Sequence, residues 1–312
     1  MSAMDELRNV AGFEQNGFWT NTFLGLVAGL LLTTTTMAQE ETKTSDRTLR
    51  QQTVLGEAET EQSAVGPYGQ PEWTARPHRF ATTRHYVLPP GVAEVELWGI
   101  GVFDEGTGPA YEVQEEFLLG LPNRFQIDVY QVQARGANQD SFHHAESKFE
   151  VRWALDEWGE IPLNPTLYAE WETDPSADSD AVEYKLLLAD DLAPNWYWAG
   201  NAVYEQSYSG SRETELAVTS GLNYTVQDKK WNVGLEGEIG RATEDGSRSD
   251  PTWEYLVGPS FQYRFTDASR LRFIPLAGLG PDSPDLEALL IFGTTLMGED
   301  GPRSSTATAE RK

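Results

Sequence analysis

Residues 231–240 read WNVGLEGEIG, and this short stretch decides the fold. Two sets of side chains alternate along it, one apolar (Trp231, Val233, Leu235 and Ile239) and one polar (Asn232, Glu236 and Glu238). Successive side chains of a β-strand point to opposite faces, so one face of this stretch is apolar and the other carries carboxylates. The pattern predicts an amphipathic β-strand.

The same alternation continues from Val92 to Leu296. It predicts about twelve strands, each roughly ten to fifteen residues long. Their expected ranges are 92–103, 110–121, 124–135, 142–156, 163–173, 181–192, 195–206, 212–226, 231–241, 251–265, 270–280 and 285–296. An even number of strands is typical of single-chain bacterial barrels.

The connections between these strands alternate in length. Tight ones are expected at 122–123, 193–195, 227–230 and 266–269, and longer polar ones at 136–141, 174–180 and 243–250. The connection at 157–162 belongs to the short set but is longer than the others. Short turns on one side and longer loops on the other indicate a membrane barrel, with aromatic residues at both strand ends as interfacial girdles.

The segment before the strands has two parts. Phe23–Leu32 (FLGLVAGLLL) is an apolar run of about ten residues, followed by small residues at Thr36 and Ala38. This pattern predicts a signal peptide over residues 1–38, cleaved after Ala38, although the residues before the run are net acidic. A retained anchor or a buried helix is the alternative. Residues 39–90, rich in Glu, Thr, Gln, Pro and Gly, are expected to form a flexible periplasmic segment.

Signal peptide, polar segment and alternating body together resemble the small porin-like outer-membrane channels of Gram-negative bacteria, over about residues 92–296. The resemblance implies an all-β fold, a transmembrane antiparallel β-barrel at 91–297. It also implies contacts with outer-membrane lipid and with the barrel-assembly machinery, and passive transport of small hydrophilic solutes. The chain departs from that family after Phe292, because a polar tail at 298–312 follows the last strand.

Charge and composition exclude several functions. The formal charge is −26, from 49 acidic and 23 basic residues, so nucleic acid is not an expected partner. The chain has no Cys, which excludes disulfides and thiolate sites. The adjacent His143 and His144 point to opposite sides of a strand, and no nucleophile motif surrounds Ser141, which lies near Asn138. We therefore expect no catalytic residues, no metal site and no cofactor, and the chain is not expected to be an enzyme.

If the apolar face meets lipid, the polar face lines the lumen. The residues expected to line a pore are Glu96, Glu116, Asp128, Glu150, Arg152, Glu170, Glu183, Lys185, Glu236, Glu238, Glu254 and Arg264. Their acidic surplus predicts a mild preference for cations. Alternatively, these charges pair and plug the lumen of a closed structural or partner-binding barrel, or the chain is a soluble periplasmic β-sandwich with apolar faces inward.

A few residues break the alternation. By register, Trp98, Leu187, Leu289 and Ile291 are expected to point inward, and Glu115 outward. Bulges could repair some of these positions.

Overall fold

The computed structural model describes residues 61–76, 79–174, 179–208, 212–226, 229–245 and 248–298. The predicted signal peptide with its cleavage site, residues 39–60, and the tail after Gly298 lie outside these ranges. The described strands are β1 (Ala93–Phe103), β2 (Ala110–Leu121), β3 (Phe125–Arg135), β4 (His143–Ala154), β5 (Thr166–Asp174), β6 (Ser179–Ala193), β7 (Trp196–Ser207), β8 (Thr214–Thr225), β9 (Trp231–Thr243), β10 (Thr252–Arg264), β11 (Ser269–Gly278) and β12 (Leu286–Met297). Two short 3₁₀ turns, η1 (Glu72–Thr74) and η2 (Pro122–Arg124), accompany them.

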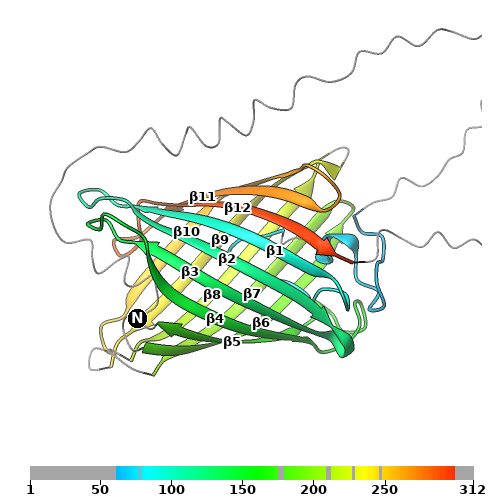
Figure 1. The fold of residues 1–312 in the computed structure, drawn as a ribbon, viewed down its shortest axis with the longest axis horizontal. Helices are drawn as coiled ribbons and strands as arrows, with labels where there is room; N and C mark the ends of the chain where they lie inside the picture. The colour runs from blue at the N-terminus through cyan, green and yellow to red at the C-terminus, as the bar shows by residue number, and fades with distance from the viewer. Residues whose placement is uncertain are drawn as a thin grey trace, which may run out of the picture. The chain divides into compact units, whose positions relative to one another are not determined.

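The twelve strands form one closed antiparallel barrel (Figure 1). Each strand pairs with its neighbours in the chain, and β1 pairs with β12 to close the circle. The predicted fold class is therefore confirmed, and the expected strand limits agree with the observed ones to within a few residues. The alternative of a β-sandwich is wrong, because the strands make a single closed sheet.

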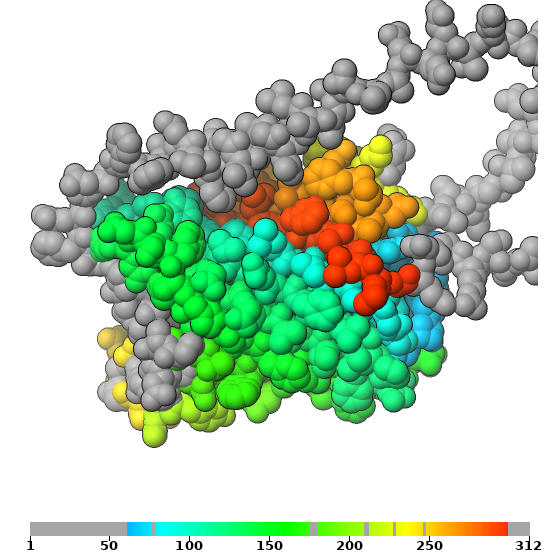
Figure 2. All heavy atoms as spheres, viewed as in Figure 1, coloured from blue at the N-terminus to red at the C-terminus, as the bar shows by residue number. Residues whose placement is uncertain are grey.

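The apolar side chains of the strands point outward. In β9, Trp231 is 52% exposed and Leu235 55% exposed, whereas Glu236 is 1% exposed. Figure 2 shows the continuous outer wall formed by the first strands. An apolar exterior around a fully paired backbone is the arrangement that a lipid bilayer requires of a barrel. Among the described residues, no helix is long and apolar enough to cross a membrane.

The connections divide the barrel into two ends. The turn end carries residues 122–124, 155–165, 194–195, 226–230 and 265–268, and the loop end carries 104–109, 136–142, 175–178, 208–213, 244–251 and 279–285. The predicted alternation of short and long connections holds with two exceptions: 155–165 is long at the turn end, and only four residues separate β5 from β6 at the loop end, where a longer loop was expected. In the first, Trp158 donates its backbone N–H to the carbonyl of Tyr68, 3.0 Å away, so that exception exists because the connection packs against the segment before β1.

Residues 61–76 and 79–92, which we call the luminal segment, lie packed against the inner wall of the barrel. They appear in blue near the start of β1 in Figure 1. Trp73 and Phe80 are fully buried, and the backbone N–H groups of Ala81 and Thr82 donate to the inward Glu236, at 2.7 and 3.0 Å. The described part of residues 39–90 is thus packed inside the barrel; that this segment is flexible and periplasmic stays a prediction.

Two wall glycines make room for the luminal segment. A Cβ atom at Gly221 of β8 would overlap the ring of Phe80, and one at Gly120 of β2 would overlap the backbone of Pro89. The last residues of the segment also bond to β2: the N–H of Gly91 donates to Gly120, and the N–H of Gly120 donates to Val92, each at 2.9 Å. The segment thus continues directly into β1.

The luminal segment explains most of the residues that break the alternation. Trp98, Leu289 and Ile291 point inward as expected and pack with Ala81 of the segment in one buried cluster. Leu187 is also fully buried, and Glu115 is exposed on the outer face. Trp98, Leu289 and Ile291 need no bulge, because the lumen holds a partner for their apolar side chains.

Aromatic rings lie at both ends of the outer surface, as the sequence predicts. Phe125 stacks on Trp153 and Trp231 contacts Tyr263 at the turn end, while Trp171 is exposed near the loop end. Trp158, in the turn-end connection 155–165, packs edge-on against Trp73 and Tyr86 of the luminal segment instead of joining these outer rings.

Candidate functional site

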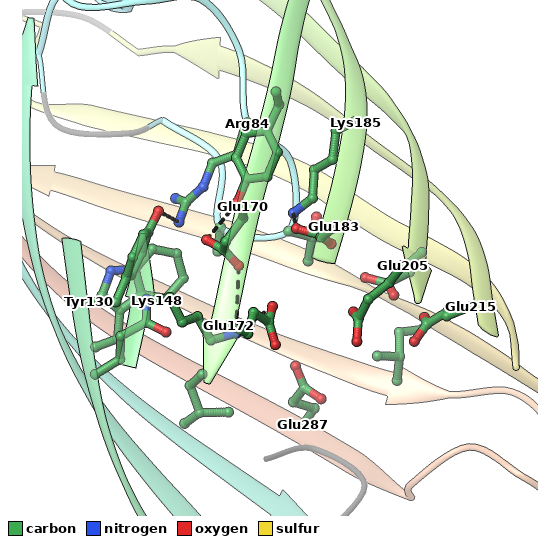
Figure 3. Close-up of a pocket in the computed structure, with 18 of the residues that line it drawn as sticks. Arg84, Tyr130, Lys148, Glu170, Glu172, Glu183, Lys185, Glu205, Glu215 and Glu287 are labelled. Atoms are coloured by element: carbon green, nitrogen blue, oxygen red, sulfur yellow. Dashed lines mark hydrogen bonds and ion pairs between the residues drawn. The ribbon is translucent and has the colours of Figure 1, made fainter. Parts of the chain in front are cut away.

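A cavity of about 250 Å³ lies between the luminal segment and the loop end. Its floor includes Ala81, Thr82 and Arg84 of the luminal segment. Its walls come from inward side chains of the strands, many of which are drawn as sticks in Figure 3. We call this cavity the vestibule; its wall residues are Trp98, Ile100, Gln114, Tyr130, Lys148, Tyr168, Glu170, Glu172, Glu183, Lys185, Glu205, Glu215, Glu238, Glu254, Leu256 and Glu287.

The vestibule is acidic and its charges are unevenly placed. Eight glutamates line it against three basic residues, Arg84, Lys148 and Lys185. All three basic residues come from the luminal segment, β4 and β6, whereas β7 to β12 contribute five glutamates and Leu256. In Figure 3, Glu205 and Glu215 lie on the side of the cavity away from Arg84 and Tyr130. The cavity is therefore mixed in charge on one wall and acidic on the other.

The acidic side chains include a row in cross-strand register. One carboxylate from each of six consecutive strands faces the next directly: Asp128, Glu150, Glu170, Glu183, Glu205 and Glu215. Like charges placed directly opposite one another destabilise a sheet. The row therefore opposes folding, and basic side chains must offset part of its charge.

Wall lysines and an arginine offset much of the row. Nζ of Lys148 lies 3.0 Å from Glu172 and 3.8 Å from Glu170, and Nζ of Lys185 lies 2.7 Å from Glu183. Deeper in the barrel, Arg152 pairs with both Asp128 and Glu150. The wall therefore carries its own cations on β4 and β6.

The luminal segment fills the turn-end half of the lumen through a second charged cluster. Arg79, fully buried, donates from Nη1 to Asn223 (3.2 Å), Thr225 (3.1 Å) and Asn232 (2.5 Å) of β8 and β9. Its Nη2 pairs with Glu61 at 2.9 Å. Glu61 and Arg79 belong to different parts of the luminal segment, 61–76 and 79–92, so this cluster joins both parts to the wall.

Glu61 is strongly held as a carboxylate in this cluster. Burial would raise its pKa, but the charges of Arg79 and Arg270 and a hydrogen bond from Thr225 outweigh burial. The pKa of Glu61 is lowered to about 2. The charge of this group is thus part of what keeps the luminal segment in place.

All twelve residues expected to line a pore lie on the inner side of the barrel. Five of them line the vestibule: Glu170, Glu183, Lys185, Glu238 and Glu254. The other seven are buried deeper in the barrel: Glu96, Glu116, Asp128, Glu150, Arg152, Glu236 and Arg264. Glu236 bonds the luminal segment, and Arg264 pairs with Glu72 at 3.1 Å. That these residues line a conducting path stays a prediction.

Sequence reasoning missed the residues that the luminal segment contributes, Arg79 and Arg84 above all. It also missed Glu287 and the two tyrosines of the vestibule, Tyr130 and Tyr168. The inward apolar residues of the wall were the available signal, because a buried Trp98 beside Glu96 requires a packing partner in the lumen.

Two groups of carboxylates bring their oxygens together among the described residues: Glu116 with Asp128 and Glu150, and Glu170 with Glu172 and Glu183. Both groups already contact basic side chains, Arg152 in the first and Lys148 and Lys185 in the second. Neither group includes His143 or His144. The ring of His144 instead lies 3.2 Å from the hydroxyl of Ser147.

No family model matches the chain, and no curated protein matches it. Among solved structures, an outer membrane channel from Pseudomonas putida F1 is similar, with 12% identity and a TM-score of 0.49 over 68% of this chain and 97% of that one. The NanC porin (13% identity, TM-score 0.47, 65% and 100% covered) and the KdgM porin (9%, 0.44, 65% and 99%) are also similar. The expected likeness to porin-like barrels is thus found as a likeness of fold.

Proposed function

We propose that this chain is a bacterial outer-membrane channel for small hydrophilic solutes, with a mild preference for cations. The observation that carries the proposal is the division of the closed barrel into an apolar outer surface and a carboxylate-rich interior with a vestibule. Such an exterior suits lipid, and an acidic cavity with low-dielectric walls concentrates cations and repels anions. In the state described here, the luminal segment fills the turn-end half of the lumen, so conduction requires that this segment moves.

The proposed localisation implies partners outside the lumen. Export through the signal peptide, cleavage after Ala38 and insertion by the barrel-assembly machinery belong to this proposal. The exposed apolar residues on the strands would then contact outer-membrane lipid.

The test is current through the full chain in planar lipid bilayers. Discrete conductance steps are expected, with a reversal potential in a KCl gradient that indicates cation preference. Loss of the preference in 1 M salt would follow from screening, since the Debye length falls to about 3 Å. A folded, heat-modifiable protein that gives no steps at any voltage or salt concentration would contradict the channel.

A closed barrel is the second candidate function, and one observation favours it. The luminal segment bonds to side chains of many strands, among them Asn201 of β7, Asn232 of β9 and Gln126 of β3. Under this alternative the loop-end vestibule binds a solute or partner without passage. Liposome swelling with neutral sugars separates the two, because only a channel admits sugar.

A further inference from the structure

Arg84 lies at the floor of the vestibule, and its side chain occupies a cradle of three wall residues. Its Nη2 lies 3.4 Å from a carboxylate oxygen of Glu116 and 3.3 Å from the hydroxyl of Tyr130. Its guanidinium carbon lies 5.0 Å from the ring centroid of Trp98. Figure 3 shows the guanidinium beside Tyr130. A carboxylate, a phenol and an aromatic face together form the chemistry that recognises a planar organic cation.

The backbone of Arg84 is fixed independently of its side chain. Its N–H donates to Oδ1 of Asn201 at 2.8 Å, and Nδ2 of Asn201 donates to its carbonyl at 2.9 Å. The amide of Asn201 therefore aims the guanidinium at the cradle. The contacts of Nη2 with Glu116 and Tyr130 are longer than ordinary charge-assisted hydrogen bonds, which measure about 2.7–2.9 Å, and are accordingly weaker.

Glu116 takes its cation from the luminal segment, unlike its neighbours on the wall. Glu96 faces Glu116 directly across β1 and β2, and pairs with the wall residue Arg272 at 2.8 Å. Glu150 pairs with the wall residue Arg152. Glu116 is 1% exposed, and its second oxygen, Oε1, accepts no hydrogen bond. If the luminal segment leaves, this buried carboxylate loses the ion pair that the structure shows for it.

We propose that Trp98, Glu116 and Tyr130 form a binding site for guanidinium-type organic cations, which Arg84 occupies from within the chain when the lumen is closed. The role of this site in transport rests on the proposed channel function. Trp98 and Tyr130 line the vestibule, so a cation that enters from the loop end reaches the site that Arg84 holds. A solute bearing a guanidinium or similar group competes with Arg84 and weakens the docking of the luminal segment.

The test measures binding of methylguanidinium to the folded full chain in detergent micelles by titration calorimetry, with neutral methylurea as comparison. Arg84→Ala empties the cradle and is expected to bind methylguanidinium with a Kd of about 1 mM. Wild type is expected to bind at least tenfold more weakly, because its own Arg84 competes. Methylurea is expected to bind neither protein, because it lacks the charge that Glu116 requires.

Second substitutions in the Arg84→Ala background locate the site. Glu116→Gln is expected to abolish binding of methylguanidinium. Glu115→Gln is the matched control, because Glu115 is the next residue of β2 but lies on the outer face, and it is expected to leave the Kd unchanged. Equal binding to wild type and to all variants, or no binding to a folded Arg84→Ala protein, overturns the proposal.

A second variant keeps the binding test possible if Arg84→Ala does not fold. If Arg84→Ala yields no heat-modifiable protein, Arg84→Gln provides the same comparison, with an amide shorter than the guanidinium it replaces. The binding measurement requires no current, so its failure is distinguishable from failure of the channel. Conductance without binding overturns only the cation site, and binding without conductance overturns only the channel.

Discussion

The two halves of the lumen share one wall pattern but are filled differently. At the turn end, inward polar side chains such as Asn223 and Asn232 bond to Arg79 of the luminal segment. At the loop end, inward glutamates such as Glu205 and Glu215 surround a cavity. The alternation of the strands makes both halves polar, so the wall itself does not decide which half is closed. The luminal segment, about thirty residues directly before β1, causes that difference.

The largest expected effect is on the filled half. Arg79→Ala removes four polar contacts and leaves Glu61 buried without its nearest cation, so we expect a loss of about 3–5 kcal/mol in the free energy of unfolding. Urea titration in micelles would measure it. Arg248→Ala, which breaks an exposed pair at 3.9 Å with Asp245, is the control and should cost about 0–1 kcal/mol. A small effect of Arg79→Ala would mean that the luminal segment contributes little to stability.

Acid is expected to weaken the packing of the luminal segment at the turn end. Glu61 has a pKa of about 2 in the folded protein against an ordinary 4.5, so its stabilisation is present above pH 4.5 and is lost as the pH falls toward 2. The difference corresponds to roughly 3 kcal/mol. Protease sensitivity of the luminal segment, measured against pH, should rise in that range. Glu61→Gln should be more sensitive at neutral pH and should lose this component of the pH dependence; an unchanged profile would contradict the assignment.

A third change tests the fit of the segment against the wall. Gly221→Val puts a side chain where the ring of Phe80 lies, so we expect a cost of about 1–3 kcal/mol from overpacking and faster proteolysis of the luminal segment. Gly99→Ala is the control, because its Cβ would meet its nearest neighbour, the carbonyl oxygen of Leu290, at an ordinary 3.8 Å. Equal proteolysis of the two variants would mean that Phe80 does not need the space at Gly221.

The smallest effect is expected in the open half. Glu205→Gln together with Glu215→Gln removes two charges from the acidic wall of the vestibule, so the cation preference in a KCl gradient should fall at about 0.1 M salt and change little at 1 M. The folding of the variant should be unimpaired, because two like charges in register are removed. Glu244→Gln, exposed in the connection between β9 and β10, should leave the reversal potential unchanged.

The strands were predictable because a two-residue period has few interpretations when it recurs twelve times. In β9 and β10, apolar and polar side chains alternate with few exceptions, so both strand limits and inward residues followed from the sequence. The outward direction of the apolar face followed only in combination with the loop lengths, since alternation by itself fits a dry core equally well.

The luminal segment was not predictable by the same reasoning. It is held to the wall by separate contacts of Arg79 and of the backbone of residues 81–84, and such contacts leave no period in the sequence. Its composition resembles that of disordered chains, which lack the apolar surface to offset ordering entropy. Here the wall supplies the polar partners, and Trp98, Leu289 and Ile291 supply the apolar ones.

The direct continuity of the luminal segment with β1 has a kinetic consequence. The bonds between Gly91, Gly120 and Val92 fix its last residues to the barrel, so a segment that swings out remains tethered at the turn end. Return is then an intramolecular step, at an effective concentration of about millimolar that dilution of the protein cannot change. The duration of openings in such a channel would then be independent of the number of copies in the membrane.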